Sequence, residues 1–151
     1  MAITYAPKVG EILECNFGQF EFTTGTENIN DKNYNGRIPP EMVKRRMIVV
    51  LNGKLDSGCL VVPISSSKNI GYIQRGLHVP INTNFFRVTD FYDERERWAK
   101  CDLVQLVSKK RLFKFIDEGQ RFDQFLNRDL VTEIQNSVIK AINAASLLTV
   151  K

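Results

Sequence analysis

The feature that most constrains the fold is a change of hydrophobic period near residue 116. Before this point the apolar residues form short runs or alternate with polar ones, which is typical of β-strands. Beyond it they recur at the spacing of one helix face: Leu130, Val131, Ile134, Val138, Ala141, Ile142 and Ala145. This order predicts a mostly β protein that ends in an amphipathic α-helix.

Four segments before residue 81 have the pattern of strands. Residues 11–17 alternate, so one face of a half-buried strand is apolar. Met47–Leu51 and Cys59–Ile64 are short apolar runs separated by NGKLDSG, which predicts a buried hairpin at the centre of the sheet. Residues 77–81 contain Pro80, which lacks a backbone N–H and therefore favours an edge strand.

A longer strand is predicted from Trp98 to Val107, followed by another over residues 112–116. Alternation along the longer strand puts Trp98, Lys100 and Asp102 on one face. A cation and a carboxylate would then lie side by side. Two polar stretches interrupt the strands, and we expect a long loop at 23–40 and irregular structure at 65–76.

Composition narrows the class of protein. A chain of 151 residues with 43% apolar content suits one domain. The excess of 21 Lys and Arg over 17 Asp and Glu favours polyanionic partners only weakly. Three cysteines, at 15, 59 and 101, fit neither a disulfide framework nor a zinc site. With no signal segment and no apolar run of about 20 residues, we expect a cytoplasmic protein without membrane attachment.

Several kinds of catalytic site have no counterpart in the sequence. It contains no metal-ligand spacing, no G-x-S-x-G and no phosphate-binding P-loop, so we expect neither metal nor cofactor. The one histidine, His78, lies between Leu77 and Val79, and these neighbours offer no group to orient it. We therefore predict a half-buried strand residue there and leave His78 out of the site.

Basic, hydroxyl and carboxylate side chains, which can bind phosphate or transfer protons, lie where the predicted strands begin or end. Lys44, Arg45 and Arg46 lead into MIVVL, Ser65 and Ser66 follow CLVVPI, and Lys100 and Asp102 lie on the third segment. Each group alone has an ordinary structural explanation, such as a solvated turn or a surface ion pair worth at most about 1 kcal/mol.

Together and in this order, the segments PKVGEILECNF, EMVKRRMIVVL, CLVVPISS and WAKCDLVQLVSKKRL resemble the PemK/MazF (Kid) family of type II toxin-antitoxin ribonucleases. The resemblance implies an SH3-barrel-like twisted antiparallel sheet with a carboxy-terminal helix. It implies a single domain over residues 1–151, with loop insertions at 18–39 and 70–97. It also implies a homodimer, a groove for single-stranded RNA across the interface, and an antitoxin protein partner.

The resemblance assigns catalytic roles to four residues. Arg46 matches the arginine that contacts the scissile phosphate, and Ser65 matches a Thr or Ser that hydrogen-bonds it. Asp102 matches the aspartate assigned as base in some members, and Lys100 stands where those members have an arginine assigned as acid. The implied activity is metal-independent RNA cleavage to 2′,3′-cyclic phosphate and 5′-hydroxyl ends. In other relatives the arginine matched by Arg46 is the base.

Further residues are candidates for RNA contacts. Glu41 matches an acidic residue of the family loop, and basic, hydroxyl or aromatic side chains are suited to phosphates and bases. The RNA-binding candidates are Glu41, Lys44, Arg45, Ser66, Trp98, Lys109, Lys110 and Arg111, with Lys114 as a further phosphate contact. Phe20 and Phe22 are additional stacking candidates, although core packing is the ordinary role of such rings and of Trp98.

Two alternative functions remain open. Met47, Pro40 and Lys100 replace the proline, histidine and arginine of the family pattern, which is the sequence support for a catalytically inactive module that binds RNA or protein. A gyrase inhibitor of the related CcdB type is the other alternative. Such toxins end in Trp-Gly-Ile, whereas this chain ends in SLLTVK.

Overall fold

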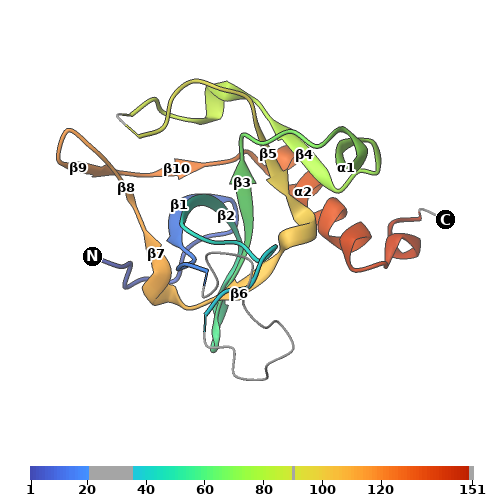
Figure 1. The fold of residues 1–151 in the computed structure, drawn as a ribbon, viewed down its shortest axis with the longest axis horizontal. Coiled ribbons are helices and arrows are strands. Elements are labelled where there is room, and N and C mark those ends of the chain that lie inside the picture. The colour runs from blue at the N-terminus through green and yellow to red at the C-terminus, as the bar shows by residue number, and fades with distance from the viewer. Residues whose placement is uncertain (21–35, 90, 150–151) are drawn as a thin grey trace.

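One antiparallel sheet organises the chain, and a long helix packs against it (Figure 1). The computed structural model describes residues 1–20, 36–89 and 91–149. The main path of the sheet is, in spatial order, β10 (Gln124–Phe125), β1 (Glu11–Asn16), β2 (Arg45–Leu55), β3 (Gly58–Ser65), β5 (Arg97–Lys100) and β4 (His78–Ile81). The predicted mostly β fold with a carboxy-terminal helix is confirmed.

Shorter elements complete the fold. β6 (Gln105–Val107) pairs with β3, and β7 (Leu112–Phe113) pairs with β1. A separate hairpin consists of β8 (Phe115–Asp117) and β9 (Gln120–Phe122). The helices are α1 (Ile70–Gln74) and α2 (Arg128–Ala141), and 3₁₀ turns span Thr83–Phe85, Cys101–Leu103, Lys109–Arg111 and Ala145–Leu148.

The hairpin of β2 and β3 forms the middle of the sheet, as predicted. Its pairs run from Met47 opposite Ile64 to Leu55 opposite Gly58, so both strands extend beyond the apolar runs of the sequence. β4 is the last strand of the sheet and, among the described strands, pairs only with β5. The missing N–H of Pro80 therefore costs no hydrogen bond to a second neighbouring strand. The predicted edge position of this strand is confirmed.

Both faces of the central strands are buried. On one face, Val49, Val62 and Ala99 pack with Leu130 and Ile134 of α2. The other face carries a second apolar cluster, which contains Leu13, Cys15, Phe17, Ile48, Val50, Val61 and Leu112. Because a strand with two buried faces shows a continuous apolar run, MIVVL and CLVVPI are easy to find in the sequence.

α2 begins at a conventional cap. The side chain of Asn127 accepts a hydrogen bond from the backbone N–H of Leu130 at 2.9 Å, which satisfies one of the free donors of the first turn. Ser137, also on the buried side of α2, donates to the carbonyl of Gly76 at 2.5 Å. The helix is thus tied to the segment before β4.

The predicted strand 98–107 is wrong. β5 ends at Lys100, a 3₁₀ turn occupies Cys101–Leu103, and pairing resumes only at Gln105. β5 and β6 both pair with β3, so the turn interrupts what would otherwise be one continuous strand beside β3. Simple alternation therefore does not relate Lys100 to Asp102. The predicted irregular stretch 65–76 also contains a short helix, α1.

Candidate active site

Arg46 and Ser65 meet at the open end of the central hairpin. Met47 pairs with Ile64, so the next antiparallel positions are Arg46 and Ser65, and their side chains leave the same face of the sheet. Both residues line a cleft of about 190 Å³. The register of two buried strands thus joins two predicted site residues that are far apart in the sequence.

The guanidinium of Arg46 is anchored through Nε, while its two terminal nitrogens are available to a ligand. Its Nε donates to the carbonyl oxygen of Val43 at 3.1 Å. Within the described part of the chain, no hydrogen bond or ion pair engages its two terminal nitrogens. A guanidinium anchored in this way can offer two parallel donors to a phosphate.

The Ser65 hydroxyl accepts a hydrogen bond from the backbone N–H of Ser67 at 3.1 Å. Its own hydrogen has no acceptor among the described residues, so it is available to a ligand oxygen. Ser66 is exposed and lines the same cleft. The turn after β3 therefore contributes two serine residues to the lining of the cleft.

The turn before Arg46 has an unusual backbone. Lys44 has a φ of +67°, a region that residues other than glycine rarely occupy. Its N–H donates to the carbonyl of Gly18 at 2.7 Å, and its carbonyl accepts from Phe17 at 2.9 Å. These two bonds fix the path into β2 and leave the Lys44 side chain exposed. Glu41 accepts from the N–H of Ile38 at 2.8 Å, so it also braces this turn.

The opposite wall of the cleft comes from a segment that sequence reasoning left out of the site. Asp93, Arg95 and Arg97 line it together with Tyr92. Arg95 is paired with Asp93 at the surface. Arg97 is buried, lies over the Phe86 ring at 5.2 Å, and donates to the carbonyl of Asp93 at 3.0 Å. The mixed-charge run DERER was the signal in the sequence for this wall.

Lys100 lies on the same face of the sheet as Ser65, because Ser65 pairs with Trp98 and Lys100 is two positions further along β5. Only 7% of Lys100 is exposed, and its Nζ donates to the carbonyl of Ser67 at 2.6 Å. Burial lowers the pKa of this ammonium group, and the charge of Asp102 partly opposes that change. Lys100 is thus turned toward the Ser65 loop.

Asp102 is paired with His78. The distance from His78 Nε2 to Asp102 Oδ1 is 2.7 Å, and His78 Cα lies opposite Lys100 in the β4–β5 ladder. The prediction that His78 has no partner to orient it is therefore wrong. The 3₁₀ turn that ends β5 carries Asp102 over the edge strand, where the carboxylate reaches the ring.

The surroundings of His78 decide its protonation state. Its Nδ1 is buried and has no hydrogen-bond partner among the described residues, and the Tyr72 ring lies edge-on at 5.0 Å. Burial lowers the pKa of His78, which the hydrogen bond to Asp102 partly counteracts. The ring is consequently neutral at pH 7, with its proton on Nε2 and donated to the Asp102 carboxylate.

Sequence comparison is consistent with this geometry. A profile of the PemK-like, MazF-like toxin of type II toxin-antitoxin systems matches residues 8–142. The chain belongs to this family. A Haemophilus influenzae protein, described as uncharacterized, is 49% identical over 144 residues and covers 95% of both chains. The Escherichia coli protein YifN, also described as uncharacterized, is 47% identical over 149 residues, which are 98% of this chain and 99% of its own.

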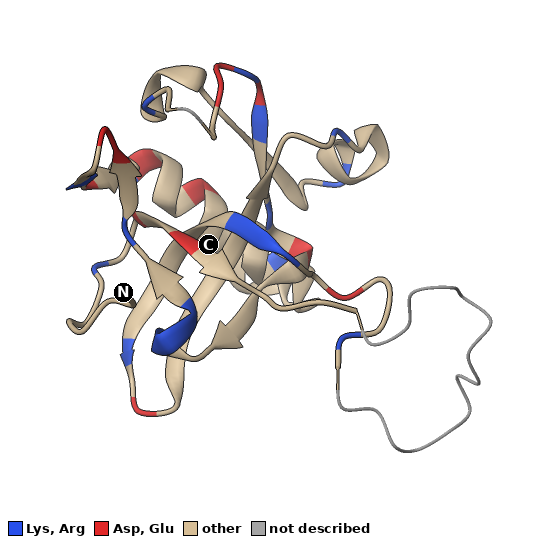
Figure 2. Cartoon of the chain, turned by 60° about the vertical axis from the view of Figure 1, so that its left-hand side comes forward, with Lys and Arg blue, Asp and Glu red and all other residues tan. Residues whose placement is uncertain are grey.

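The remaining RNA-binding candidates of this PemK/MazF chain differ in their exposure. The turn Lys109–Arg111 lies close to the Lys44 turn, because Arg111 donates to the carbonyl of Asn16 at 2.8 Å and the N–H of Phe17 donates to the carbonyl of Lys44. Figure 2 marks the Lys and Arg positions along the ribbon in blue. Trp98 is only 6% exposed and Lys68 lies over its ring, which favours core packing over base stacking. Phe20 is half-buried, and Phe22 lies outside the described residues.

Over 1–20, 36–89 and 91–149, no three His, Cys, Asp or Glu side chains are grouped as ligands for a metal ion. In the same ranges no helix combines the length and apolarity that a membrane span requires.

Proposed function

We propose that the protein is a metal-independent endoribonuclease toxin that cleaves single-stranded RNA in the cleft of Arg46 and Ser65. The observation that carries the proposal is the position of these two side chains at adjacent strand ends, one residue beyond the pair Met47–Ile64, with hydrogen-bond donors that no described residue uses. Donors preorganised for a phosphate oxygen are the main requirement for stabilising a phosphorane. Membership of the PemK/MazF family supports the same activity.

In the proposed reaction the 2′-hydroxyl attacks the adjacent phosphorus, and the bond to the 5′-oxygen breaks. Asp102 accepts the proton of the 2′-hydroxyl, and Arg46 with Ser65 stabilises the charge on the phosphorane oxygens. Lys100 gives a proton to the leaving 5′-oxygen. The products are a 2′,3′-cyclic phosphate and a 5′-hydroxyl, and the two protons balance between base and acid.

His78 enters this mechanism as a positioning residue. Its Nε2–H fixes one carboxylate oxygen of Asp102, which leaves the other oxygen for the substrate. Lys100 has a lowered pKa because it is buried, and a weaker hold on its proton suits a general acid. To reach the leaving oxygen, its ammonium exchanges the Ser67 carbonyl for the substrate. Arg46 is the alternative base.

The test is cleavage of a mixed-sequence RNA in excess EDTA, followed by identification of the fragment ends. We expect cleavage with 2′,3′-cyclic phosphate ends, because the cleft supplies cationic and hydroxyl donors without a metal. Intact RNA, or cleavage that EDTA abolishes, would contradict the proposal. Fragments with 3′-hydroxyl ends would point to a different attacking group.

One observation favours a second candidate, a catalytically inactive RNA-binding module. The Lys100 ammonium is buried and already hydrogen-bonded, unlike the open guanidinium of Arg46. Such a module would hold RNA in EDTA without cutting it. In either case we propose a cytoplasmic homodimer with an antitoxin partner, in keeping with a toxin-antitoxin family.

A further inference from the structure

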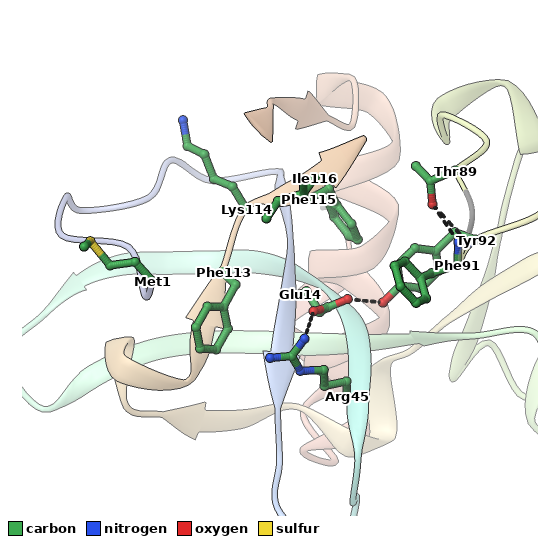
Figure 3. A pocket seen from close by; sticks show the side chains of 10 residues that line it. All are labelled: Met1, Glu14, Arg45, Thr89, Phe91, Tyr92, Phe113, Lys114, Phe115 and Ile116. Atoms are coloured by element: carbon green, nitrogen blue, oxygen red, sulfur yellow. Dashed lines mark hydrogen bonds and ion pairs between the residues drawn. The ribbon is translucent and has the colours of Figure 1, made fainter. Parts of the chain in front are cut away.

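A second cleft adjoins the Arg46–Ser65 cleft. It measures about 450 Å³ and lies between β1, β7, β8 and the segment that precedes β5 (Figure 3). Its volume is in the range of about 300–1,000 Å³ that is typical of small-ligand sites. The two clefts share Arg45, Phe91 and Tyr92 as lining residues, so they are contiguous.

The polar centre of this cleft is the Glu14 carboxylate. Arg45 Nη1 lies 3.2 Å from Oε1, and the Tyr92 hydroxyl donates to Oε2 at 2.6 Å. The Glu14 side chain is 18% exposed, whereas that of Arg45 is 61% exposed. Burial and the neighbouring carboxylate raise the pKa of Tyr92, so its hydroxyl stays protonated and holds Glu14 in place.

The walls of the cleft are aromatic. The Arg45 guanidinium lies over the Phe113 ring at 5.4 Å, and Phe91 is 87% exposed at the mouth (Figure 3). Exposed aromatic rings and guanidinium planes are the surfaces on which unpaired bases stack. An ionised carboxylate adds a requirement, because it can only accept hydrogen bonds. The occupant must therefore be flat and must present donors at its edge.

We propose that this cleft binds a guanine base next to the scissile phosphate, a specificity that rests on the proposed ribonuclease function. The Watson–Crick edge of guanine has two adjacent donors, N1–H and N2–H, beside the acceptor O6. Glu14 accepts from the two donors, and Arg45 donates to O6. Uracil has one donor between two acceptors, and adenine and cytosine each bring one donor group to the carboxylate. Of the four bases, only guanine offers two adjacent donors to Glu14 together with an acceptor for Arg45.

Binding tests this assignment without depending on cleavage. The ligands are fluorescent ten-residue oligodeoxyuridylates with one central deoxyguanosine, deoxyinosine or deoxyadenosine, or with none. They lack the 2′-hydroxyl, so the proposed reaction cannot destroy them. We expect the deoxyguanosine oligomer to bind at least about fivefold more tightly than the all-uridine one, with deoxyinosine in between because it lacks the 2-amino group.

The decisive variant is Glu14→Gln, which keeps the size of the side chain but turns one acceptor into a donor. We expect it to lose the guanine preference and to retain the affinity for the all-uridine oligomer within about twofold. Tyr92→Phe, which frees one Glu14 oxygen from its hydrogen bond, should reduce the preference only in part. Retained all-uridine binding shows that each variant is folded.

Equal binding of all four oligomers, stronger binding of deoxyadenosine, or an unchanged preference in Glu14→Gln would overturn the inference. These outcomes are separate from those for the ribonuclease. If the protein cuts RNA but shows no guanine preference, only the guanine-binding proposal fails. If the protein prefers guanine but does not cut RNA, the guanine-binding proposal stands and the ribonuclease proposal fails.

Discussion

The two parts of the candidate active site differ in how their polar groups are used. In the Arg46–Ser65 cleft, the guanidinium and the hydroxyl keep donors that no described residue accepts. In the cluster of Lys100, His78 and Asp102, each side chain already has a close partner, at 2.6 or 2.7 Å. Lys100 lies on the same face of the sheet as Arg46 and Ser65, yet none of the three clustered residues lines the Arg46–Ser65 cleft. One part is therefore open and the other is enclosed.

This difference separates binding from proton transfer. An open pair of donors is ready for an anion and needs no rearrangement, whereas enclosure fixes the orientation of Lys100 and His78 and lowers the pKa of each through burial. We infer that changes in the cleft weaken both RNA binding and cleavage. Changes in the enclosed cluster should alter cleavage while leaving binding nearly intact, and the predictions below test this division.

The largest effect is expected for Asp102→Asn. The amide oxygen can still accept the His78 Nε2–H, so the fold is retained, but the side chain can no longer take a proton. Single-turnover cleavage should slow by about 10²- to 10⁴-fold. Binding of an uncleavable oligodeoxynucleotide should change less than twofold.

The matched control is Asp56→Asn, since Asp56 is exposed in the tight turn between β2 and β3. It should cleave like the unmodified protein. If Asp102→Asn cleaved within twofold of the unmodified protein, Asp102 would not be the base, and Arg46 would become the leading candidate for that role.

The next effect is expected for Arg46→Ala, which removes the open donors of the cleft. Cleavage should fall by about 10²- to 10³-fold, as for other losses of a donor to the reacting oxyanion. Unlike Asp102→Asn, this variant should also bind the oligodeoxynucleotide more weakly, and fluorescence anisotropy measures that loss. Arg121→Ala, at an exposed arginine of β9, is the control. Unchanged binding in Arg46→Ala would contradict the inference that the Arg46–Ser65 cleft binds the RNA.

The sequence was most informative where local pattern decides structure. Continuous apolar runs predicted β2 and β3, and helical spacing predicted α2, because burial imposes those patterns directly. The hairpin register then put Arg46 next to Ser65, one position beyond the pair of Met47 with Ile64. The strand predicted over residues 112–116 is divided into β7 and the start of β8, and β9 and β10 were missed, since two or three residues carry too little pattern to identify a strand.

The enclosed cluster shows what local pattern cannot supply. His78 and Asp102 are 24 positions apart and meet only because a 3₁₀ turn replaces the continuous strand after Lys100. Alternation placed Asp102 beside Lys100 and left His78 without a partner. The wall of Arg95 and Arg97 was missed for a similar reason, because only tertiary packing brings that segment to the cleft.

A smaller effect on activity is expected at His78. His78→Leu removes the donor that fixes Asp102, and cleavage should slow by about tenfold, which corresponds to losing about 1.5 kcal/mol from one hydrogen bond to a charged group. His78→Gln has an amide N–H in the region of Nε2 and should recover most of the rate. A merely structural role would not distinguish the two variants in this way. Equal rates for Leu and Gln would refute the positioning role.

The smallest effect concerns stability rather than activity. Because burial lowers the pKa of His78 below its usual 6.5, the unfolded chain binds a proton more readily than the folded one as pH falls through 6.5. Protonation therefore favours unfolding, and this contribution should lower the free energy of unfolding by at most about 1.4 kcal/mol per pH unit. Above pH 6.5 the contribution should vanish, since the ring is neutral in both states.

Urea denaturation at pH 7 and pH 5 measures this effect as a difference between the unmodified protein and His78→Gln. The variant keeps a donor to Asp102 but does not titrate, so its loss of stability over that interval should be smaller. The nearby Lys100 charge disfavours a protonated ring, whereas Asp102 favours it. An equal or greater loss in the variant would show that Asp102 compensates fully for burial, and that the ring is protonated as easily in the folded protein as in the unfolded chain.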